Sequence, residues 1–327
     1  MKLECPTYGD LKRAAERLEG HARKTPLHSH PLIDKIAGAN IYLKDETAQK
    51  TGSFKYRGAR ARMSLLSETE KRRGVVAFSS GNHAQGVALN ARELGTHAVI
   101  VMPKTAPAKK KHGTKALGAR IVEYDIATQS REALAEQIAR DENRVLIPAF
   151  DDPLVIAGQG TCGLELMDQC KAQGFTPDMV IAPLGGGGLA AGVGLAARTR
   201  SPETKMFGAE PFDFDDHYRS LQTGKRETFP PGGQTICDAL MSPRPGHLTL
   251  ALNRHQLSGV FRVSDAEVLL AMRLAWETLG LKLEPGGAIA LAAALNPANV
   301  ANGMTVCVIL SGGNVDENIF ARALDSG

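Results

Sequence analysis

The sequence lacks the apolar segments that would carry it into or through a membrane. It has no run of about 18 apolar residues, and its start, "MKLECPTYGDLKRAAERLEG", has no apolar stretch like that of a secretory signal. Its five cysteines are odd in number and scattered, and no C-x-x-C pair occurs among them. Reduced thiols fit this pattern best, so we expect a cytoplasmic location and no membrane partner.

A strong charge of either sign is missing as well. Lys and Arg total 39 against 35 Asp and Glu, which gives a net charge of +4. This balance is too mild to predict binding to nucleic acid or to an anionic membrane. Repeats, low-complexity segments and long linkers are also absent. The 327 residues, of which 43% are hydrophobic, suffice for two domains or one large α/β unit.

The chain does contain an alternation of apolar, often β-branched runs with helical patterns. The apolar runs cover residues 74–79, 97–103, 119–125, 144–150 and 178–185. Continuous apolar strands separated by helices of roughly 10–15 residues indicate parallel sheets that are covered by helices on both faces. The sequence therefore predicts an α/β fold with three-layer α/β/α domains and mainly parallel sheets.

The same pattern suggests where the chain divides. Residues 72–150 have the alternation of a compact three-layer unit of their own. Residues 1–71 would then join residues 151–327 in a larger domain. We expect a small and a large domain with these boundaries.

Four consecutive glycines, Gly185 to Gly188, stand in "PLGGGGLAAG", where an apolar strand ends and a helix begins. Without Cβ atoms, their backbone N–H groups can converge on an anion at the helix N-terminus. The spacing matches neither G-x-G-x-x-G nor G-x-x-x-x-G-K-[ST], so neither a dinucleotide nor a nucleoside triphosphate is expected. A phosphate ester suits the loop better. A flexible strand–helix turn is the simpler alternative.

Two further polar turns follow apolar strands. The segment "SSGNHAQG" (79–86) places hydroxyls, a carboxamide and backbone N–H groups at a helix start, which suits a carboxylate ligand. A single serine acting as a helix N-cap would explain part of this pattern. The segment "LSGGNVDE" (310–317) follows the strand "MTVCVI", and open α/β sheets bind ligands at the carboxyl ends of their strands.

Lys55 stands among small, hydroxyl and aromatic residues in "TGSFKYRGA" (51–59). An exposed lysine has a pKa of about 10.4, whereas an apolar pocket disfavours its charge and frees the amine for imine chemistry and proton transfer. A sheltered lysine, a phosphate loop and a carboxylate loop together suggest a pyridoxal phosphate enzyme that acts on an amino acid. A plain surface position of Lys55 is the alternative.

In this order and spacing, "TGSFKYRGA", "SSGNHAQG", "GGGG" and "SGGN" resemble the second fold type of pyridoxal phosphate enzymes, within the serine/threonine dehydratase and serine racemase family. The resemblance covers essentially the whole chain. It implies two three-layer domains with twisted sheets, a cofactor in the cleft between them and a substrate loop in the small domain. It also implies a homodimer.

The resemblance assigns roles to individual residues. Lys55 would form the Schiff base with the cofactor, and Ser80 would be a second catalytic group. Ser311 would face the pyridine nitrogen, and a hydroxyl does not keep that nitrogen protonated, which favours prompt β-elimination or fast reprotonation over transamination. The implied cofactor-binding residues are Phe54, Lys55, Asn82, Gly185, Gly186, Gly187, Gly188 and Ser311. The implied substrate-binding residues are Ser79, Ser80, Asn82, His83 and Arg131.

The implied reaction is that of an ammonia-lyase. Lys55 would remove the α-proton and the β-hydroxyl would leave, giving a 2-oxo acid and ammonia from L-threonine, L-serine or threo-3-hydroxyaspartate. Ser80 keeps an amino-acid racemase, or a bifunctional enzyme, as an alternative, because racemisation needs acid–base groups on both faces of Cα. A third alternative is a non-catalytic sensor of a phosphate ligand, which would not need Lys55.

The resemblance also implies a second substrate contact at Arg131 and a divalent-cation site. A guanidinium at Arg131 could bind the second carboxylate of 3-hydroxyaspartate as a fork, although a solvated charge on a helix is the simpler interpretation. The segment "GAEPFDFDDHYRS" (208–220) resembles the family's divalent-cation loop. Glu210 and Asp216 would bind through carboxylates and Phe214 through its backbone carbonyl, a hard oxygen site for structural Mg²⁺ or Ca²⁺. An acidic surface loop is the alternative.

Overall fold

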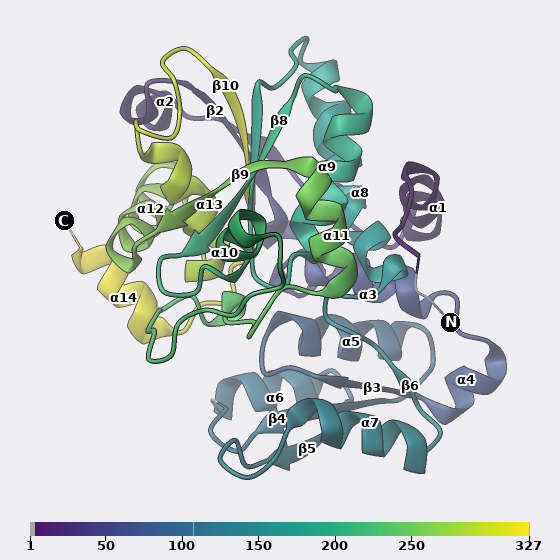
Figure 1. Ribbon diagram of the computed structural model, residues 1–327. Coiled ribbons are helices and arrows are strands. Elements are labelled where there is room, and N and C mark those ends of the chain that lie inside the picture. The colour runs from purple at the N-terminus through teal and green to yellow at the C-terminus, as the bar shows by residue number, and fades with distance from the viewer. Residues whose placement is uncertain (1–3, 107, 327) are drawn as a thin grey trace.

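The computed structural model describes residues 4–106 and 108–326, and its strands form two separate sheets (Figure 1). The larger sheet has six strands in the order β1-β2-β10-β7-β8-β9, and the smaller has four in the order β5-β4-β3-β6. The strands of the larger sheet are β1 (Leu27–His28), β2 (Asn40–Asp45), β7 (Met179–Pro183), β8 (Lys205–Pro211), β9 (Leu257–Val263) and β10 (Thr305–Leu310). The strands of the smaller sheet are β3 (Val75–Phe78), β4 (Ala98–Pro103), β5 (Arg120–Tyr124) and β6 (Val145–Leu146).

Helices connect and cover these strands. The helices that precede the smaller sheet or flank its strands are α1 (Tyr8–Leu18), α2 (Pro31–Ala37), α3 (Lys55–Met63), α4 (Glu68–Arg73), α5 (Asn82–Glu93), α6 (Ala108–Ala116) and α7 (Arg131–Asp141). The later helices are α8 (Pro153–Ala172), α9 (Gly188–Arg200), α10 (Asp216–Thr223), α11 (His247–Gln256), α12 (Asp265–Leu279), α13 (Pro285–Leu295) and α14 (Glu317–Asp325). Three short 3₁₀ helices are η1 (Glu46–Ala48), η2 (Lys50–Gly52) and η3 (Asp238–Leu240). None of the helices in the described residues combines the length and apolarity needed to cross a bilayer.

The larger sheet is buried on both faces because alternate residues of its strands point to opposite sides. Ile181 and Val308 join a core cluster with residues of α12 and α13. Their neighbours Val180 and Ile309 belong to a second cluster with residues of α8 and α9. This double burial explains why the strands appear in the sequence as continuous apolar runs.

The smaller sheet repeats the arrangement. Val75 and Ala77 pack in one cluster with residues of α5, whereas Val76 and Val99 pack in another with Ala135 of α7. Every strand pairing in both sheets is parallel except that of β1 with β2. The predicted α/β fold with mainly parallel sheets is therefore confirmed.

Each sheet draws its strands from one of the two predicted parts of the chain, since the smaller sheet spans only β3 to β6. The division into residues 72–150 and residues 1–71 with 151–327 itself stays a prediction. One expected strand is much shorter than the apolar run 144–150 suggests. Only Val145–Leu146 pair with β3, because the chain then leaves the sheet toward the pocket described below.

Helix α3 crosses α8 at very short range. A Cβ on Gly158 would lie 2.7 Å from Gly58 Cα and 2.7 Å from the carbonyl oxygen of Arg57, so only glycine fits at this crossing. The close approach fixes α3 against α8. Because Lys55 is the first residue of α3, its backbone position is fixed as well.

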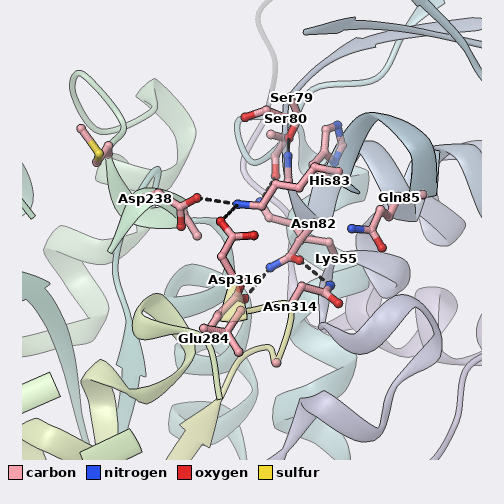
Figure 2. A pocket seen from close by; sticks show the side chains of 18 of the residues that line it. Lys55, Ser79, Ser80, Asn82, His83, Gln85, Asp238, Glu284, Asn314 and Asp316 are labelled. Carbon is pink, nitrogen blue, oxygen red and sulfur yellow. Dashed lines mark hydrogen bonds and ion pairs between the residues drawn. The ribbon is translucent and has the colours of Figure 1, made fainter. Parts of the chain in front are cut away.

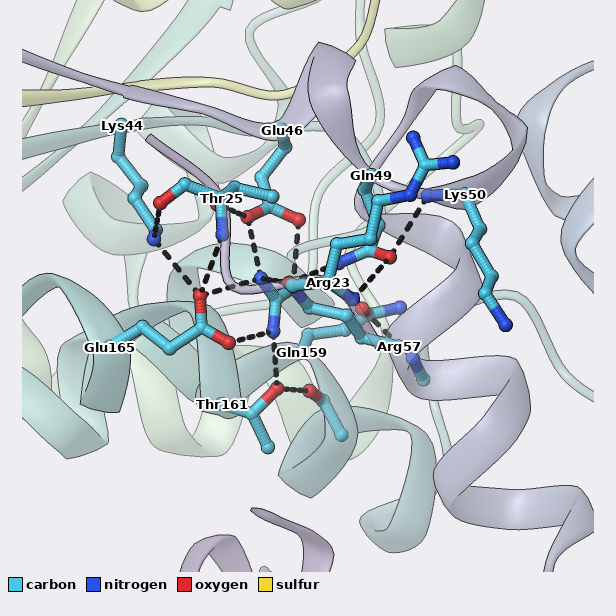
Figure 3. A network of polar contacts seen from close by, with 12 residues as sticks. Arg23, Thr25, Lys44, Glu46, Gln49, Lys50, Arg57, Gln159, Thr161 and Glu165 are labelled. Atoms are coloured by element: carbon cyan, nitrogen blue, oxygen red, sulfur yellow. Dashed lines mark hydrogen bonds and ion pairs between the residues drawn. The ribbon is translucent and has the colours of Figure 1, made fainter. Parts of the chain in front are cut away.

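A buried network of charges ties the same helix down (Figure 3). Arg57 Nε lies 2.7 Å from Glu46 Oε2, and its Nη1 lies 2.7 Å from Glu165 Oε1. Lys44 Nζ lies 2.9 Å from Glu165 Oε2. Two cations thus balance two carboxylates, and three of the four side chains are almost completely buried.

Candidate active site

Backbone hydrogen bonds join the lysine segment to the "SGGN" turn near the other end of the chain. The N–H of Phe54 donates to the carbonyl of Ser311 at 3.1 Å, and the N–H of Gly313 donates to the carbonyl of Gly52 at 2.9 Å. Ser53 and Gly312 form an isolated antiparallel bridge between these contacts. Two of the motifs found in the sequence therefore meet directly beside the end of β10.

Lys55 lines a pocket of about 460 Å³ between the small and large parts of the molecule (Figure 2). Its ammonium donates to the carbonyl of Ala149 at 2.7 Å, and its Nζ lies 5.1 Å from the ring centroid of Phe54. Burial lowers the pKa of Lys55 to about 8, partly opposed by the carboxylate of Glu284. The amine is therefore much easier to deprotonate than an exposed lysine.

The glycine loop connects β7 to α9 and opens toward the same pocket through Gly186. A Cβ on Gly186 would lie 2.3 Å from the Phe150 ring, and Gly187 has a φ of 91°. Within the described part of the chain, no group accepts a hydrogen bond from the N–H of Gly185, Gly186 or Gly187. Free N–H groups at the start of a helix fit a phosphate group.

The loop before α5 forms another wall of the pocket. Ser79 accepts a hydrogen bond from the N–H of Gly81 at 3.2 Å, whereas the Ser80 hydroxyl has no hydrogen-bond partner among the described residues. His83 Nε2 lies 2.9 Å from the carbonyl oxygen of Ile147. Burial, together with the nearby charge of Lys55, lowers the pKa of His83 to about 3. His83 is therefore neutral and holds the loop in place.

Asn82 and Ser311 lie deep beside this pocket. Asn82 donates to Glu284 Oε1 at 2.5 Å and accepts from the amide of Asn314 at 2.7 Å. The Ser311 hydroxyl donates to the carbonyl of Gly286 at 3.4 Å, a long contact that leaves both lone pairs of the hydroxyl oxygen available.

The structure adds acidic and basic residues that sequence reasoning missed. Glu284 precedes α13, and burial raises its pKa to about 7 although Asn82 partly opposes this shift. Lys110 Nζ lies 2.9 Å from Asp238 Oδ2 and 3.6 Å from Asp316 Oδ2. Glu284 had one signal in the sequence, because it precedes Pro285 and proline is favoured at the first position of a helix. The contacts of Lys110 join three segments that are distant in the sequence, and no local pattern in the sequence pointed to them.

The pocket brings together many of the residues expected from the sequence, namely Lys55, Ser79, Ser80, Asn82, His83, Arg131 and Gly186. Phe54 packs instead against a core cluster, and Ser311 is almost fully buried. Arg131 donates to Glu132 at 2.8 Å, and its guanidinium lies 5.6 Å from the Phe78 ring centroid. The roles given to these residues stay predictions.

A second cluster of ionisable groups lies where β8 leads into α10. The Glu210 carboxylate accepts hydrogen bonds from the backbone N–H groups of His217 and Tyr218, each at 3.0 Å. Both side-chain oxygens of Asp216 are buried and have no hydrogen-bond partner among the described residues. Burial raises the pKa of Glu210 and that of Asp216 to about 8. Two buried carboxylates that lack a paired cation fit a site for a metal ion. Phe214 packs against Phe229 at 4.3 Å between ring centroids, and the metal role of its carbonyl stays a prediction.

Comparisons with known proteins agree with this geometry. A family model described as "Pyridoxal-phosphate dependent enzyme" matches residues 18–312. The L-threo-3-hydroxyaspartate ammonia-lyase of a Pseudomonas species is 40% identical over 98% of this chain and 99% of its own. The serine racemase of Dictyostelium discoideum is 37% identical, and a crystal structure of it superposes with a TM-score of 0.88 over 95% of this chain and 99% of that chain. A threonine deaminase from T.th. is 40% identical, and its crystal structure superposes with a TM-score of 0.90 over 95% of this chain and 99% of that chain.

Proposed function

Because the chain belongs to the family of pyridoxal-phosphate dependent enzymes, we propose that it is an ammonia-lyase for 3-hydroxy amino acids. It converts L-threonine, L-serine or threo-3-hydroxyaspartate into the 2-oxo acid and ammonia by α,β-elimination. The observation that carries the proposal is the easily deprotonated Lys55, which lines one pocket with the 79–83 loop and Gly186.

The protein residues would hold pyridoxal 5′-phosphate in the orientation that the reaction needs. When bound, this cofactor supplies a ring that withdraws electrons from Cα of the substrate. Lys55 would attach it covalently, and the free N–H groups of Gly185, Gly186 and Gly187, followed by Gly188 at the start of α9, would bind its phosphate. The residues that would contact its ring are Phe54, Asn82 and Ser311.

Lys55 also moves the proton at the reacting carbon. The Lys55 amine would accept the α-proton of a substrate bound in this pocket. The 79–83 loop, with Ser79, Asn82, His83 and the N–H groups at the start of α5, holds the substrate carboxylate. A second carboxylate would reach Arg131, whose Glu132 partner belongs to the same helix and is half exposed.

A panel of L- and D-hydroxy amino acids tests the proposed reaction. We expect equimolar 2-oxo acid and ammonia from at least one of L-serine, L-threonine and L-threo-3-hydroxyaspartate. If Arg131 binds a second carboxylate, Arg131→Leu should lower the use of hydroxyaspartate relative to L-serine by about tenfold, as loss of a charge-assisted hydrogen bond predicts. Purified protein that shows no visible cofactor band and releases no ammonia from the panel would contradict the proposal.

The second candidate function is an amino-acid racemase. It is favoured by Ser80, whose hydroxyl has no hydrogen-bond partner among the described residues and lines the same pocket as Lys55. A proton donor on the face of Cα opposite Lys55 would allow the configuration to invert.

Ser80→Ala separates the two activities. We expect this variant to lose racemisation of L-serine by about 10²-fold or more, the usual contribution of one acid–base group, and to keep most elimination from the L-substrate. Chiral chromatography of serine and parallel 2-oxo acid assays measure both. Racemisation that persists in Ser80→Ala would remove this hydroxyl from the mechanism.

We propose further that Glu210 and Asp216, with the carbonyl of Phe214, hold a structural divalent cation. The two buried, unpaired oxygens of Asp216 support this assignment. A homodimer and a cytoplasmic location are also proposed. The five free cysteines support the reducing compartment, and the homodimer rests on the family resemblance of the sequence motifs.

A further inference from the structure

The cation cluster contains a histidine that a hard oxygen site does not need. His217 lies on α10, next to Asp216, and its side chain is fully buried. Its Nδ1 lies 3.3 Å from Glu210 Oε1 and 3.7 Å from Asp216 Oδ2. One ligand atom from each of these three residues lies within 4.8 Å of the others. Ordinary core packing does not explain why a ring nitrogen lies so close to two carboxylates.

A buried polar side-chain atom usually has a hydrogen-bond partner. Here Nδ1 makes no hydrogen bond to any described residue, although it is buried. An unpaired ring nitrogen and two unpaired oxygens of Asp216 therefore face the same small space.

We propose that His217 Nδ1 is a third side-chain ligand and that the ion is a first-row transition metal, Mn²⁺ or Zn²⁺, bound in preference to Mg²⁺ or Ca²⁺. This inference rests on the cation site proposed above. Imidazole nitrogen suits transition metals, whereas Mg²⁺ and Ca²⁺ take oxygen ligands almost exclusively. Ligand atoms about 2.1 Å from one ion lie roughly 3.0–3.4 Å apart, so the distances from Nδ1 to the two carboxylates need only a small inward adjustment.

The other ring nitrogen connects the cluster to the glycine loop. His217 Nε2 lies 3.4 Å from Asn253 Nδ2, which also donates to the carbonyl of Gly187 at 3.3 Å, while Asn253 Oδ1 is buried without a partner. If a metal ion binds Nδ1, the ring proton lies on Nε2. With the Asn253 side-chain amide flipped, its Oδ1 would accept a hydrogen bond from this Nε2–H group. The Gly187 carbonyl would still accept from the N–H of Ala191 at 3.0 Å. The ion would thus be linked to the loop proposed to bind phosphate.

Metal binding to the holoenzyme tests the inference without an activity assay. Calorimetric titrations with Mn²⁺, Zn²⁺, Mg²⁺ and Ca²⁺ should show tighter binding of the first two. Electron spin echo measurements on the Mn²⁺ form should detect a directly bound nitrogen. In His217→Asn we expect Mn²⁺ affinity to fall by at least about tenfold, a loss seen even when an outer partner of a ligand is removed, while Mg²⁺ affinity changes less.

Asp216→Asn is the matched variant, because it should weaken binding of all four ions. If no ion binds the wild-type protein, the cation site itself is wrong. If ions bind through Asp216 but no nitrogen is detected and His217→Asn keeps the same order of affinities, only the role of His217 is wrong. The visible cofactor band reports whether each variant folds. Should His217→Asn not fold, the nitrogen signal of the wild-type Mn²⁺ form decides alone.

Discussion

Lys55→Ala is expected to abolish covalent attachment of the cofactor and to lower the rate of 2-oxo acid release by at least about 10⁴-fold. The upper end of what one general base contributes is about 10⁴, and this variant loses the attachment as well. The amine that is lost is one whose pKa burial has lowered to about 8. Visible absorption after dialysis measures the attachment, and coupled assays of the 2-oxo acid measure the rate.

Two further variants make this result specific. Lys55→Arg keeps a cation but should not restore activity, because a guanidinium stays protonated at any pH the enzyme tolerates. Lys50→Ala removes a lysine of the same segment that pairs with Glu93 at 2.8 Å, and should keep the cofactor band. A band of wild-type intensity in dialysed Lys55→Ala would favour a phosphate-ligand sensor over an enzyme.

The sequence predicted the elements of the site that depend on local pattern. The glycines and the "SGGN" turn follow β7 and β10 of the larger sheet, whose parallel strands end at one edge, so the meeting of these two motifs could be expected from the sequence. The serine loop follows β3 of the smaller sheet, and its place near Lys55 was expected from the family resemblance alone. The pairing of Ser53 with Gly312 shows how the first and last of these segments meet.

The residues that the sequence did not reveal act through contacts between distant segments. Asn82 and Glu284, which are hydrogen-bonded, lie 202 positions apart in the sequence, and Lys110 and Asp238 lie 128 positions apart. No local pattern in the sequence could therefore predict either contact. His217 was visible in "DDHY", but an expected oxygen-only site gave no reason to include a nitrogen. Burial and the direction of a side chain decide these roles, and neither can be derived from one sequence.

Arg57→Met is expected to lower the free energy of unfolding by about 3–5 kcal/mol, because it leaves buried carboxylates without their main cation. Among the described residues, Arg57 is the only cation of the network that contacts both Glu46 and Glu165 (Figure 3). Lys44 would still pair with Glu165, but Glu46 would keep only neutral donors such as Thr25, whose hydroxyl lies 2.6 Å away. Urea unfolding of the holoenzyme measures the change.

The same substitution at the surface should behave differently. Arg120 pairs with Glu142, and their side chains are 53% and 35% exposed, so Arg120→Met should cost less than about 1 kcal/mol. Adding Glu46→Gln to Arg57→Met should recover part of the loss, because it removes the stranded charge. Equal urea midpoints for Arg57→Met and Arg120→Met would contradict the role given to the network.

Arg57 lies two residues after Lys55 in α3. Loss of the Arg57 ion pairs should therefore loosen the start of this helix and also weaken cofactor attachment at Lys55.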